Sequence, residues 1–483
     1  MRRWVVLILL VVVAAAFVAF AVEWVERCAA RGDVLRYFEA GEAILTDGDP
    51  YAGSSLATAG YLCAPFFALL MVPFALLPRV VAAALWFVFN FGSLILLFSV
   101  SLYLLESPAI PLSAWLRRKL VNLRGGKLNW VLIGTAAVSA RLWWDNLGSG
   151  QINVPLWAFG FLGVYLIQRG KKGTGGAVLG AAVLVKLMAA PLLLYLLIRR
   201  EFRALLSVVI AAAVLSTASA AFLGWGRNAH LIRRWYQIVL RPAVAEHYYY
   251  VIERNESVPA SLYAYNRLIN RGHPSRYLYV WRHLRWLNAA TVALFASVIA
   301  FFVVKCGFIK RRAGPAADNL LLGLIVLTGV LLQPLAWLQH FVVAIFPYMA
   351  VLYYAPRIEA AGVRYACYTL LALSFAGHTL IAADIWGAAT EDAFFRLKTV
   401  TFAVLLLYAA VVVQLFAVCC RRPRLPVLVH AGQASEREAV GSRNRSAAAG
   451  ASERLYCFGS RRGAAPRSGA AAGPDFRKGA SRV

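Results

Sequence analysis

The chain has 483 residues, of which 61% are hydrophobic and only 15% are charged, and this balance excludes an ordinary soluble globular protein. Apolar runs of about 20 residues, each long enough to cross a bilayer, recur along most of its length. The net charge of +28 does not indicate nucleic-acid binding. Lys and Arg instead collect in short loops beside the apolar runs and in the C-terminal tail, as the positive-inside rule describes. The composition therefore predicts an all-α polytopic membrane protein.

The first predicted span is 4–22. Arg2 and Arg3 hold its start on the inner side, so residues 24–60 emerge on the outer side. This outer segment is polar and Gly-rich, and it contains a predicted helix over 34–45.

The next apolar run, 61–78, is short and is interrupted by Pro65 and Pro73. A full span over 83–105 follows, and the basic segment 106–127 should lie on the inner side. If both runs crossed the membrane, the basic segment 106–127 would lie on the outer side, against the positive-inside rule. We therefore expect 61–78 to be re-entrant or interfacial.

Spans over 128–142 and 154–167 are expected to flank an outer loop at 143–153. The apolar run 174–198 has basic residues at both ends, which predicts a hairpin of two half-helices with Lys186 near its bend. The remaining predicted spans are 205–223, 286–304, 319–332, 341–354, 365–383 and 400–418.

Together these segments predict about 10–13 transmembrane segments, re-entrant pieces and half-helices included. The predicted transmembrane domain is 1–420, and the Gly-, Ala-, Ser- and Arg-rich residues 421–483 are predicted to be a disordered cytoplasmic tail. Most of the 22 Asp and Glu residues fall in the predicted outer segments. These outer segments are 24–60, 143–153, 224–285, 333–340 and 384–396.

Asp33 lies just beyond the expected membrane exit of the first span. A carboxylate there can act as general base on an acceptor hydroxyl while a lipid-linked donor stays in the bilayer. The alternative is that Asp33 caps the helix beginning at Val34, and spacing alone favours the cap.

The outer loop between the spans 128–142 and 154–167 contains Asp145, Gln151 and Asn153. Polar groups so close to lipid are costly unless they are paired or line a site. The loop is therefore either part of a binding site or a capped turn in which Asn153 caps the next helix.

Lys186 lies within an apolar run, where a cation is costly. It can meet the phosphate of a lipid carrier, or it can snorkel to the membrane surface. The hairpin geometry favours the phosphate, because the nearest polar flank is far along the chain.

Two later outer segments also carry candidate residues. The long outer loop contains Asn255, Ser257 and Arg267 among many Arg and aromatic residues, which bind phosphate and sugars or form an interfacial belt. The short turn 333–340 ends in His340, which either assists chemistry or is a satisfied interface residue.

The seven cysteines show neither metal-ligand spacing nor a structural disulfide framework.

In this order the segments resemble glycosyltransferase family 87 of the GT-C superfamily. The matching pieces are Asp33 with Tyr37 and Ala40-Gly41, Gly48 to Tyr51, Pro65 to Pro78, Gly150 to Asn153, Lys186 with Pro191, Asn255 to Ser257 with Arg267, and Pro334 to Trp337 with His340. The resemblance implies a GT-C-like fold and an inverting transfer of a hexose, usually mannose, from a polyprenyl-phosphate carrier.

The resemblance also implies residue roles. Asp33 would be the general base, with Lys186, His340 and outer-loop Arg residues on the donor phosphate. The substrate-binding set would be Tyr37, Tyr51, Asp145, Gln151, Asn153, Lys186, Asn255, Ser257, Arg267 and Trp337. We expect neither a metal nor another cofactor.

The expected partners are the polyprenyl-phosphate sugar, a lipid or glycan acceptor and membrane lipids, without nucleic acid. The expected location is the bacterial cytoplasmic membrane, with the active site on its extracytoplasmic face. The main alternative is a polytopic transporter or flippase of a lipid-linked or anionic substrate, since broken helices and a mid-membrane Lys also fit that class.

Overall fold

The structure is a computed structural model of the chain. It describes residues 2–55, 60–107, 109–124, 129–245, 248–249, 254–269, 279–280, 285–310 and 312–419. All of these lie within one compact unit, Met1–Arg421. The predicted tail, 421–483, falls outside the described residues.

The described residues are almost entirely helical, as the composition predicts. The exception is a two-stranded antiparallel pair, in which β1 (Tyr248–Tyr249) aligns Tyr248 with Val280 of β2 (Tyr279–Val280). The chain is therefore an all-α polytopic membrane protein.

Six helical stretches among the described residues are long and apolar enough to cross a membrane. They are α4 (Arg79–Glu106), α11 (Phe202–Ala218) with α12 (Ala220–Leu223), α15 (Arg285–Lys305), α16 (Pro315–Leu332), η3 (Leu338–Ala344) with α17 (Ile345–Tyr354) and η4 (Ala355–Arg357), and α21 (Thr399–Cys419). A seventh span is obtained if α7 (Ala140–Ser149) and α8 (Asn153–Gln168), which meet at a 118° bend, are counted as one.

Shorter apolar helices lie where the sequence predicts broken membrane segments. The 61–78 run contains only the 11-residue helix α3 (Pro65–Ala75). The 174–198 run is divided into α9 (Lys172–Val185), η1 (Leu187–Ala189) and α10 (Pro191–Ile198), with the break at Lys186. The sequence-based count of 10–13 is larger mainly because its ten full spans include 4–22, 128–142, 154–167 and 365–383, none of which corresponds to one of the six long helical stretches.

Several segments predicted as polar outer loops contain helices. The 143–153 loop is mostly the end of α7, and the 24–60 segment holds α2 (Val34–Leu45), as predicted. Other helices in such segments are α13 (Trp225–Trp235), the π-helix η2 (Tyr236–Ala245), α14 (Val258–Ile269), α19 (Ala383–Trp386) and α20 (Ala388–Arg396). These helices are too short or too polar to be recognised as spans.

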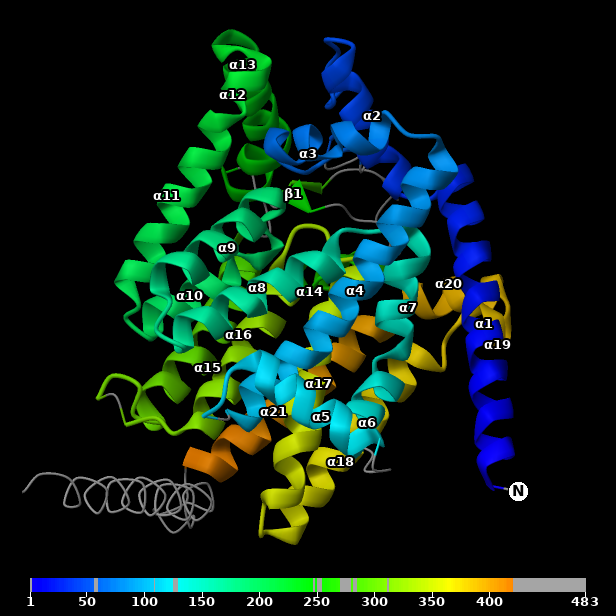
Figure 1. Cartoon of the computed structure of the whole chain (residues 1–483). Helices are drawn as coiled ribbons and strands as arrows, with labels where there is room; N and C mark the ends of the chain where they lie inside the picture. The colour runs from blue at the N-terminus through cyan, green and yellow to red at the C-terminus, as the bar shows by residue number, and fades with distance from the viewer. Residues whose placement is uncertain are drawn as a thin grey trace, which may run out of the picture. The chain divides into compact units, whose positions relative to one another are not determined.

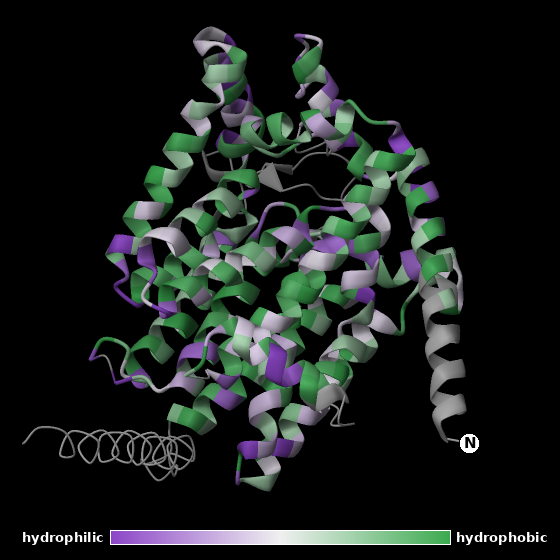
Figure 2. Ribbon diagram, in the orientation of Figure 1, coloured by the Kyte–Doolittle hydropathy of each residue, from purple (hydrophilic) through white to green (hydrophobic). Residues whose placement is uncertain are grey.

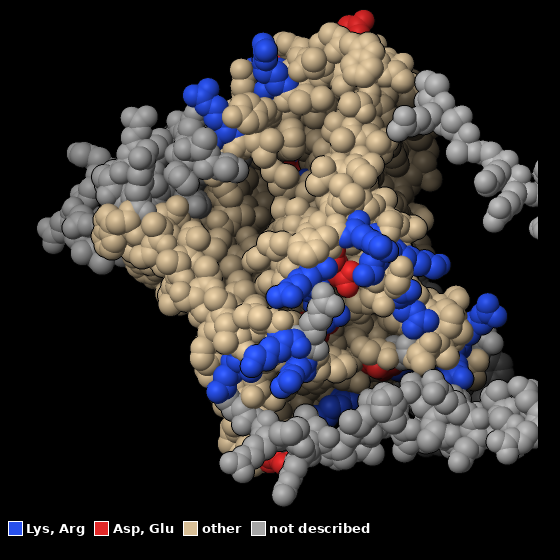
Figure 3. All heavy atoms as spheres, turned by 90° about the vertical axis from the view of Figure 1, so that its left-hand side faces the viewer, with Lys and Arg blue, Asp and Glu red and all other residues tan. Residues whose placement is uncertain are grey.

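Figure 1 shows α2, α3 and α13 together at one end of the unit Met1–Arg421. The N-terminus of α1 (Arg2–Arg31) lies toward the other end, with α5 (Leu112–Arg124), α6 (Trp130–Val138) and α18 (Ala361–Thr379). The helices between the two ends consist mainly of hydrophobic residues (Figure 2). Lys and Arg are concentrated on the lower half of one face (Figure 3). This arrangement agrees with the inner and outer sides of the membrane that were predicted from the positions of the basic segments.

Small residues let the membrane helices approach closely. A Cβ on Gly163 of α8 would lie 2.9 Å from the Gly175 carbonyl of α9, and a Cβ on Gly176 would lie 2.5 Å from the Ala204 carbonyl of α11. Without a hydrophobic driving force between helices in lipid, such close backbone packing is a main source of association. It fixes the positions of α8, α9 and α11, and α8 and α9 carry two polar residues of the site at their ends.

Cys306 and Cys419 form a disulfide that joins the ends of α15 and α21. The cysteine spacing did not predict this bond. The two residues are 113 positions apart, and connectivity over such a distance depends on tertiary structure.

Candidate active site

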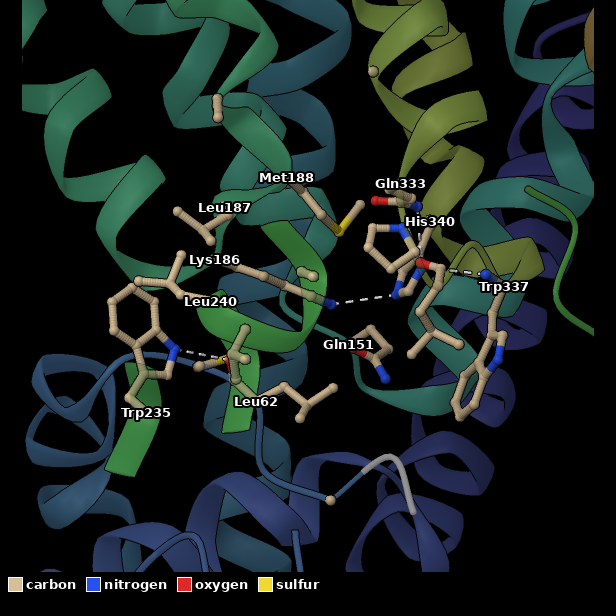
Figure 4. A pocket seen from close by; sticks show the side chains of 18 of the residues that line it. Leu62, Gln151, Lys186, Leu187, Met188, Trp235, Leu240, Gln333, Trp337 and His340 are labelled. Carbon is tan, nitrogen blue, oxygen red and sulfur yellow. Dashed lines mark hydrogen bonds between the residues drawn. The ribbon is translucent and has the colours of Figure 1, made fainter. Parts of the chain in front are cut away.

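One cavity of about 480 Å³ is formed by residues from widely separated parts of the chain. Its polar wall contains Asp33, Arg36, Tyr37, Gln151, Lys186, Gln333, Trp337 and His340. Its apolar wall includes Leu62, Leu187, Met188, Val239 and Leu240. Figure 4 shows the labelled side chains of both walls around the same space. Such a cavity suits a ligand with a charged head and a hydrocarbon tail.

Asp33 stands at the start of α2, but its side chain does not cap that helix. Its backbone N–H donates to the carbonyl of Ser149 at 2.9 Å, which ties the start of α2 to the end of α7. One carboxylate oxygen, Oδ2, accepts a hydrogen bond from Gln151 Nε2 at 2.7 Å. The helix-cap role that spacing favoured for Asp33 is therefore wrong, because the carboxylate is turned toward Gln151 and the cavity.

Tyr37, one turn further along α2, fixes the orientation of the Gln151 amide. Its hydroxyl donates to Gln151 Oε1 at 2.7 Å, so the Gln151 Nε2 group faces Asp33. Burial raises the pKa of Tyr37 well above its usual value, which keeps the hydroxyl protonated as a donor. The Oδ1 atom of Asp33 has no hydrogen-bond partner among the described residues, and Asp33 lines the cavity.

The turn at residues 150–153 positions Gln151, which lines the cavity, and the fully buried Asn153. Gly150 ends α7 with φ +69°, a left-handed conformation that glycine adopts without strain. Its carbonyl accepts a hydrogen bond from Trp86 Nε1 at 2.8 Å. Gln151 then reaches Asp33 on one side, and Asn153 reaches Lys186 on the other.

Asn153 does not cap α8, which contradicts the capped-turn alternative for this residue. It is the first residue of that helix, and its Nδ2 donates to the carbonyl of Gln339 at 3.2 Å. Its Oδ1 accepts from Lys186 Nζ at 2.9 Å.

Lys186 lies at the break between α9 and η1, where its extended backbone (φ −155°, ψ 126°) interrupts the helix. The ammonium group lies 3.3 Å from His340 Nε2, as well as contacting Asn153 (Figure 4). The snorkelling alternative is therefore wrong, since the ammonium group ends inside the cavity and not at the membrane surface.

His340 is held at both ring nitrogens. Its Nε2 lies 3.3 Å from Lys186 Nζ. Its Nδ1 accepts from the backbone N–H of Trp337 at 3.2 Å and also lies 3.0 Å from the carbonyl of Leu335. These contacts fix the orientation of the imidazole ring beside Lys186.

The segment that carries Trp337 and His340 is braced by Asn255. Asn255 donates from Nδ2 to the carbonyl of Pro334 at 2.9 Å, and its Oδ1 accepts from the backbone N–H of Ala336 at 2.9 Å. Glu256 extends the brace, because its backbone N–H donates to the Ala336 carbonyl at 2.7 Å. Asn255 thus holds the site from outside the cavity.

Sequence reasoning did not single out Arg36, which lines the cavity one turn after Asp33. Arg36 forms no ion pair within the described part of the chain. Its i, i+3 spacing from Asp33 on the predicted helix was the available signal. Trp337, which was singled out, lines the cavity, and its buried indole Nε1–H has no hydrogen-bond partner among the described residues.

A family comparison agrees with this architecture. The model of glycosyltransferase family 87 matches residues 61–334. The chain belongs to glycosyltransferase family 87. No curated protein and no solved structure gives a significant match.

The family 87 match contains Gln151, Asn153 and Lys186. Asp33 and His340 lie outside the matched range, so their assignment depends on the cavity geometry. In this family 87 protein, no group of three or more His, Cys, Asp or Glu residues in the described ranges is placed to hold a metal ion.

Other residues expected to bind substrate lie apart from the cavity of this glycosyltransferase. Tyr51 is fully buried, with its hydroxyl donating to the carbonyl of Cys63 at 2.8 Å. Asp145 lies on α7 one turn after Arg141, which pairs with Glu391. Ser257 is fully buried, and its Oγ accepts from the backbone N–H of Ala260. The side chain of Arg267 lies outside the described part of the structure.

Proposed function

We propose that this glycosyltransferase transfers a hexose, with mannose as the expected sugar, from a polyprenyl-phosphate carrier to a hydroxyl of a lipid or glycan. The observation that carries the proposal is that a half-buried carboxylate, Asp33, and a half-buried cation, Lys186, line a single cavity that also has an apolar wall. Transfer from a lipid phosphate needs these three features together.

In this mechanism Asp33 is the general base. The free Oδ1 atom takes the proton of the acceptor hydroxyl as its oxygen attacks the anomeric carbon. The bond from that carbon to the phosphate oxygen breaks on the opposite face, so the anomeric configuration inverts. The oxygen that was the acceptor hydroxyl becomes the new glycosidic oxygen.

The leaving phosphate gains negative charge as its bond to the sugar breaks. Lys186 provides a fixed positive charge, already held by Asn153 and His340, and Arg36 provides a second cation at the cavity wall. Preorganised charges of this kind stabilise the transition state without reorganisation during the reaction. The unpartnered Trp337 indole N–H is a further donor for the sugar or the phosphate.

The hydrocarbon part of the donor is expected to lie along the apolar wall. Leu62, Met188 and Leu240 line that wall, and Trp235 of α13 closes it through a hydrogen bond from Nε1 to the Leu62 carbonyl at 3.3 Å. Holding the donor lipid and the enzyme in the same membrane supplies proximity for the reaction.

The expected location of the site is the extracytoplasmic face of a bacterial cytoplasmic membrane. The supporting observation is charge distribution. Asp33 follows a first helix that begins with Arg2 and Arg3. Lys172 at the start of α9, and Arg199 and Arg200 after the end of α10, lie at the helix ends that are far from Lys186. Basic loops favour the cytoplasmic side.

Membership of a glycosyltransferase family favours the enzyme over the transporter or flippase that the broken helices also fit. A transport assay separates the two. Vesicles containing the protein should show transferase activity without net movement of lipid-linked sugar across the bilayer.

The direct test uses purified protein in lipid, radiolabelled polyprenyl-phosphomannose and a lipid extract as acceptor source. We expect label to move into acceptor, and we expect Asp33→Asn to lower the rate by about a hundredfold or more. Binding of the donor should be retained in this variant, because the amide has the shape of the carboxylate. Full activity in Asp33→Asn would refute the general-base role.

A further inference from the structure

The polar and apolar walls of the active-site cavity belong in part to two different helical segments. Asp33 and Tyr37 of the polar wall lie at the start of α2, whereas Val239 and Leu240 of the apolar wall lie in η2. α13 continues directly into η2, so residues 225–245 form one helical arm. The position of this arm relative to α2 therefore sets the distance between the two walls.

One side chain joins the start of the arm to the end of α2. Arg227, in the first turn of α13, donates from Nη2 to the carbonyls of Ala43 at 3.0 Å and Gly48 at 3.2 Å. Its Nη1 donates to the Ile44 carbonyl at 3.0 Å and pairs with Asp47 at 2.6 Å. A single guanidinium thus connects two parts of the chain that lie far apart in sequence, and Figure 1 shows α2 and α13 at the same end of the unit.

The carbonyl contacts are the stronger part of this connection. Ala43 and Ile44 lie in the last turn of α2, where the carbonyls of a helix favour a cation. The Arg227 side chain is only 22% exposed, whereas that of Asp47 is 89% exposed. An ion pair with so exposed a carboxylate contributes little to stability. Arg227 therefore holds the arm mainly through the backbone of α2 and of the residues that follow it.

The other end of α13 has contacts of its own. Trp235 donates from Nε1 to the Leu62 carbonyl at 3.3 Å, and Arg234 pairs with Asp49 at 3.1 Å. Figure 4 shows Trp235 beside Leu62, on the side of the cavity away from Trp337. Contacts at both ends of α13 fix the direction of the arm, and with it the position of η2.

We propose that Arg227 is a positioning residue that sets the distance between the two walls, and that it thereby determines how the cavity accepts the hydrocarbon chain of the donor. Arg227 itself does not line the cavity. Without its guanidinium the arm is held only at the end of α13, so η2 is free to move away from the chain. Asp33 and Lys186 keep their own contacts with Gln151 and Asn153. The inference rests on the lipid-phosphate donor of the proposed function.

A distance measurement tests the geometry without any reaction. Spin labels are attached to the full chain in nanodiscs at Glu39→Cys on α2 and Gln237→Cys on η2, both exposed positions, with Cys420 and Cys457 replaced by Ser. We expect Arg227→Ala to lengthen and broaden the distribution of distances between the labels. An unchanged distribution would overturn the proposal, whatever the enzyme transfers.

The matched control is Arg233→Ala. Arg233 is an exposed cation on the same helix, and its side chain forms no hydrogen bond or ion pair with the residues that the structure describes. Its distance distribution should equal that of the unmodified protein. The same broadening in both variants would reduce the effect to a loss of surface charge and would contradict a specific role for Arg227.

Two donors with the same head and different chains test the consequence for the substrate. They are a long-chain polyprenyl-phosphomannose and citronellyl-phosphomannose, whose short chain can contact only part of the apolar wall. We expect Arg227→Ala to raise KM for the long donor about tenfold, the equivalent of one or two hydrogen bonds, and KM for the short donor less than about threefold. kcat should change little. An equal rise for both donors would show a general loss of structure and overturn the proposal.

Two milder variants keep the test decisive if Arg227→Ala does not fold. Arg227→Lys retains the charge but reaches fewer carbonyls, so it should raise KM for the long donor by only about threefold. Asp47→Asn leaves the carbonyl contacts in place and should raise it less than about twofold. A larger effect of Asp47→Asn than of Arg227→Lys would assign the connection to the exposed ion pair and overturn the role of the carbonyl contacts.

The distance and kinetic measurements fail independently. If the unmodified protein uses neither donor while Arg227→Ala still changes the label distances, the proposed donor is wrong, and so is the part of the inference that concerns its chain. If the unmodified protein transfers sugar and the label distances of Arg227→Ala are unchanged, the positioning role is wrong and the proposed function stands.

Discussion

Gln151 donates a hydrogen bond from Nε2 to Oδ2 of Asp33 over 2.7 Å, and it does so across 118 residues of sequence. This contact leaves only one oxygen of the carboxylate free. It also places residue 151 in direct contact with the proposed general base.

The variant Gln151→Glu tests this relationship through pH. It places a second carboxyl beside Asp33, and two carboxyl groups in contact raise the pKa at which the pair gives up its last proton. A general base acts only when deprotonated. We therefore expect the acidic limb of the kcat/KM profile to move upward by about one to three pH units, so that activity lost at neutral pH returns at alkaline pH.

The control for that profile is Gln151→Leu, which removes the hydrogen bond without adding a carboxyl. It should lower the rate at every pH and leave the acidic limb without this upward displacement. Matching profiles for the two variants would contradict a role for Asp33 as the titrating base.

Lys186→Met should weaken donor binding. The ammonium group is held by Asn153 and His340 at the cavity, and a charge-assisted contact to phosphate contributes about 1.5–3 kcal/mol. We expect the dissociation constant for the polyprenyl-phosphate donor to rise about tenfold to a hundredfold. Titration of donor into protein in nanodiscs measures this constant directly.

Lys310→Met is a suitable comparison, because Lys310 is exposed and does not line the active-site cavity. Its donor affinity should equal that of the unmodified protein. Unchanged affinity in Lys186→Met as well would exclude Lys186 from the phosphate site.

Gly150→Ala should destabilise the protein. Gly150 has φ +69°, and an added Cβ would lie only 2.9 Å from the Cβ of Val34. The left-handed backbone alone costs about 1–2 kcal/mol for a non-glycine residue. Gly148→Ala, two residues earlier on α7, meets no atom within 4 Å and should be neutral or slightly stabilising. Thermal unfolding in detergent compares the pair, and equal melting temperatures would contradict the role of the turn.

Asn255→Ala should loosen the segment that carries His340. The substitution removes the bonds to the Pro334 carbonyl and the Ala336 N–H, and it leaves both groups without that partner. We expect a loss of roughly 2–4 kcal/mol in unfolding free energy and weaker donor binding. Ser257→Ala loses one hydrogen bond nearby and should have a smaller effect on both. A stable Asn255→Ala protein with normal donor affinity would show that the brace is dispensable.

Long apolar runs made much of the fold predictable. The helices α4, α15, α16 and α21 closely match predicted spans, because about 20 apolar residues in succession have few alternatives to crossing the bilayer. The break at Lys186 was also predictable, from a cation within an apolar run that has basic residues at both ends.

The family resemblance implied that Asp33, Lys186 and His340 act on one substrate, and the structure brings these three to one cavity. The sequence did not single out Arg36 as a wall residue, or show that Asn255 braces the loop from outside. These facts depend on contacts between residues far apart in sequence, such as Asn255 with Ala336, which no local pattern records. The partners of a polar residue decide whether it faces a substrate or the protein, and a sequence does not state them.

The scatter of the cavity residues along the chain has a consequence for biosynthesis. Asp33 leaves the ribosome early, whereas its eventual neighbours in the 333–340 segment are made some 300 residues later. Until then Asp33 and Lys186 have only their earlier partners, Gln151 and Asn153, and lack the histidine and backbone groups that complete the site. The assembly of the site is therefore a late event of membrane insertion, and no fragment ending before that segment can possess it.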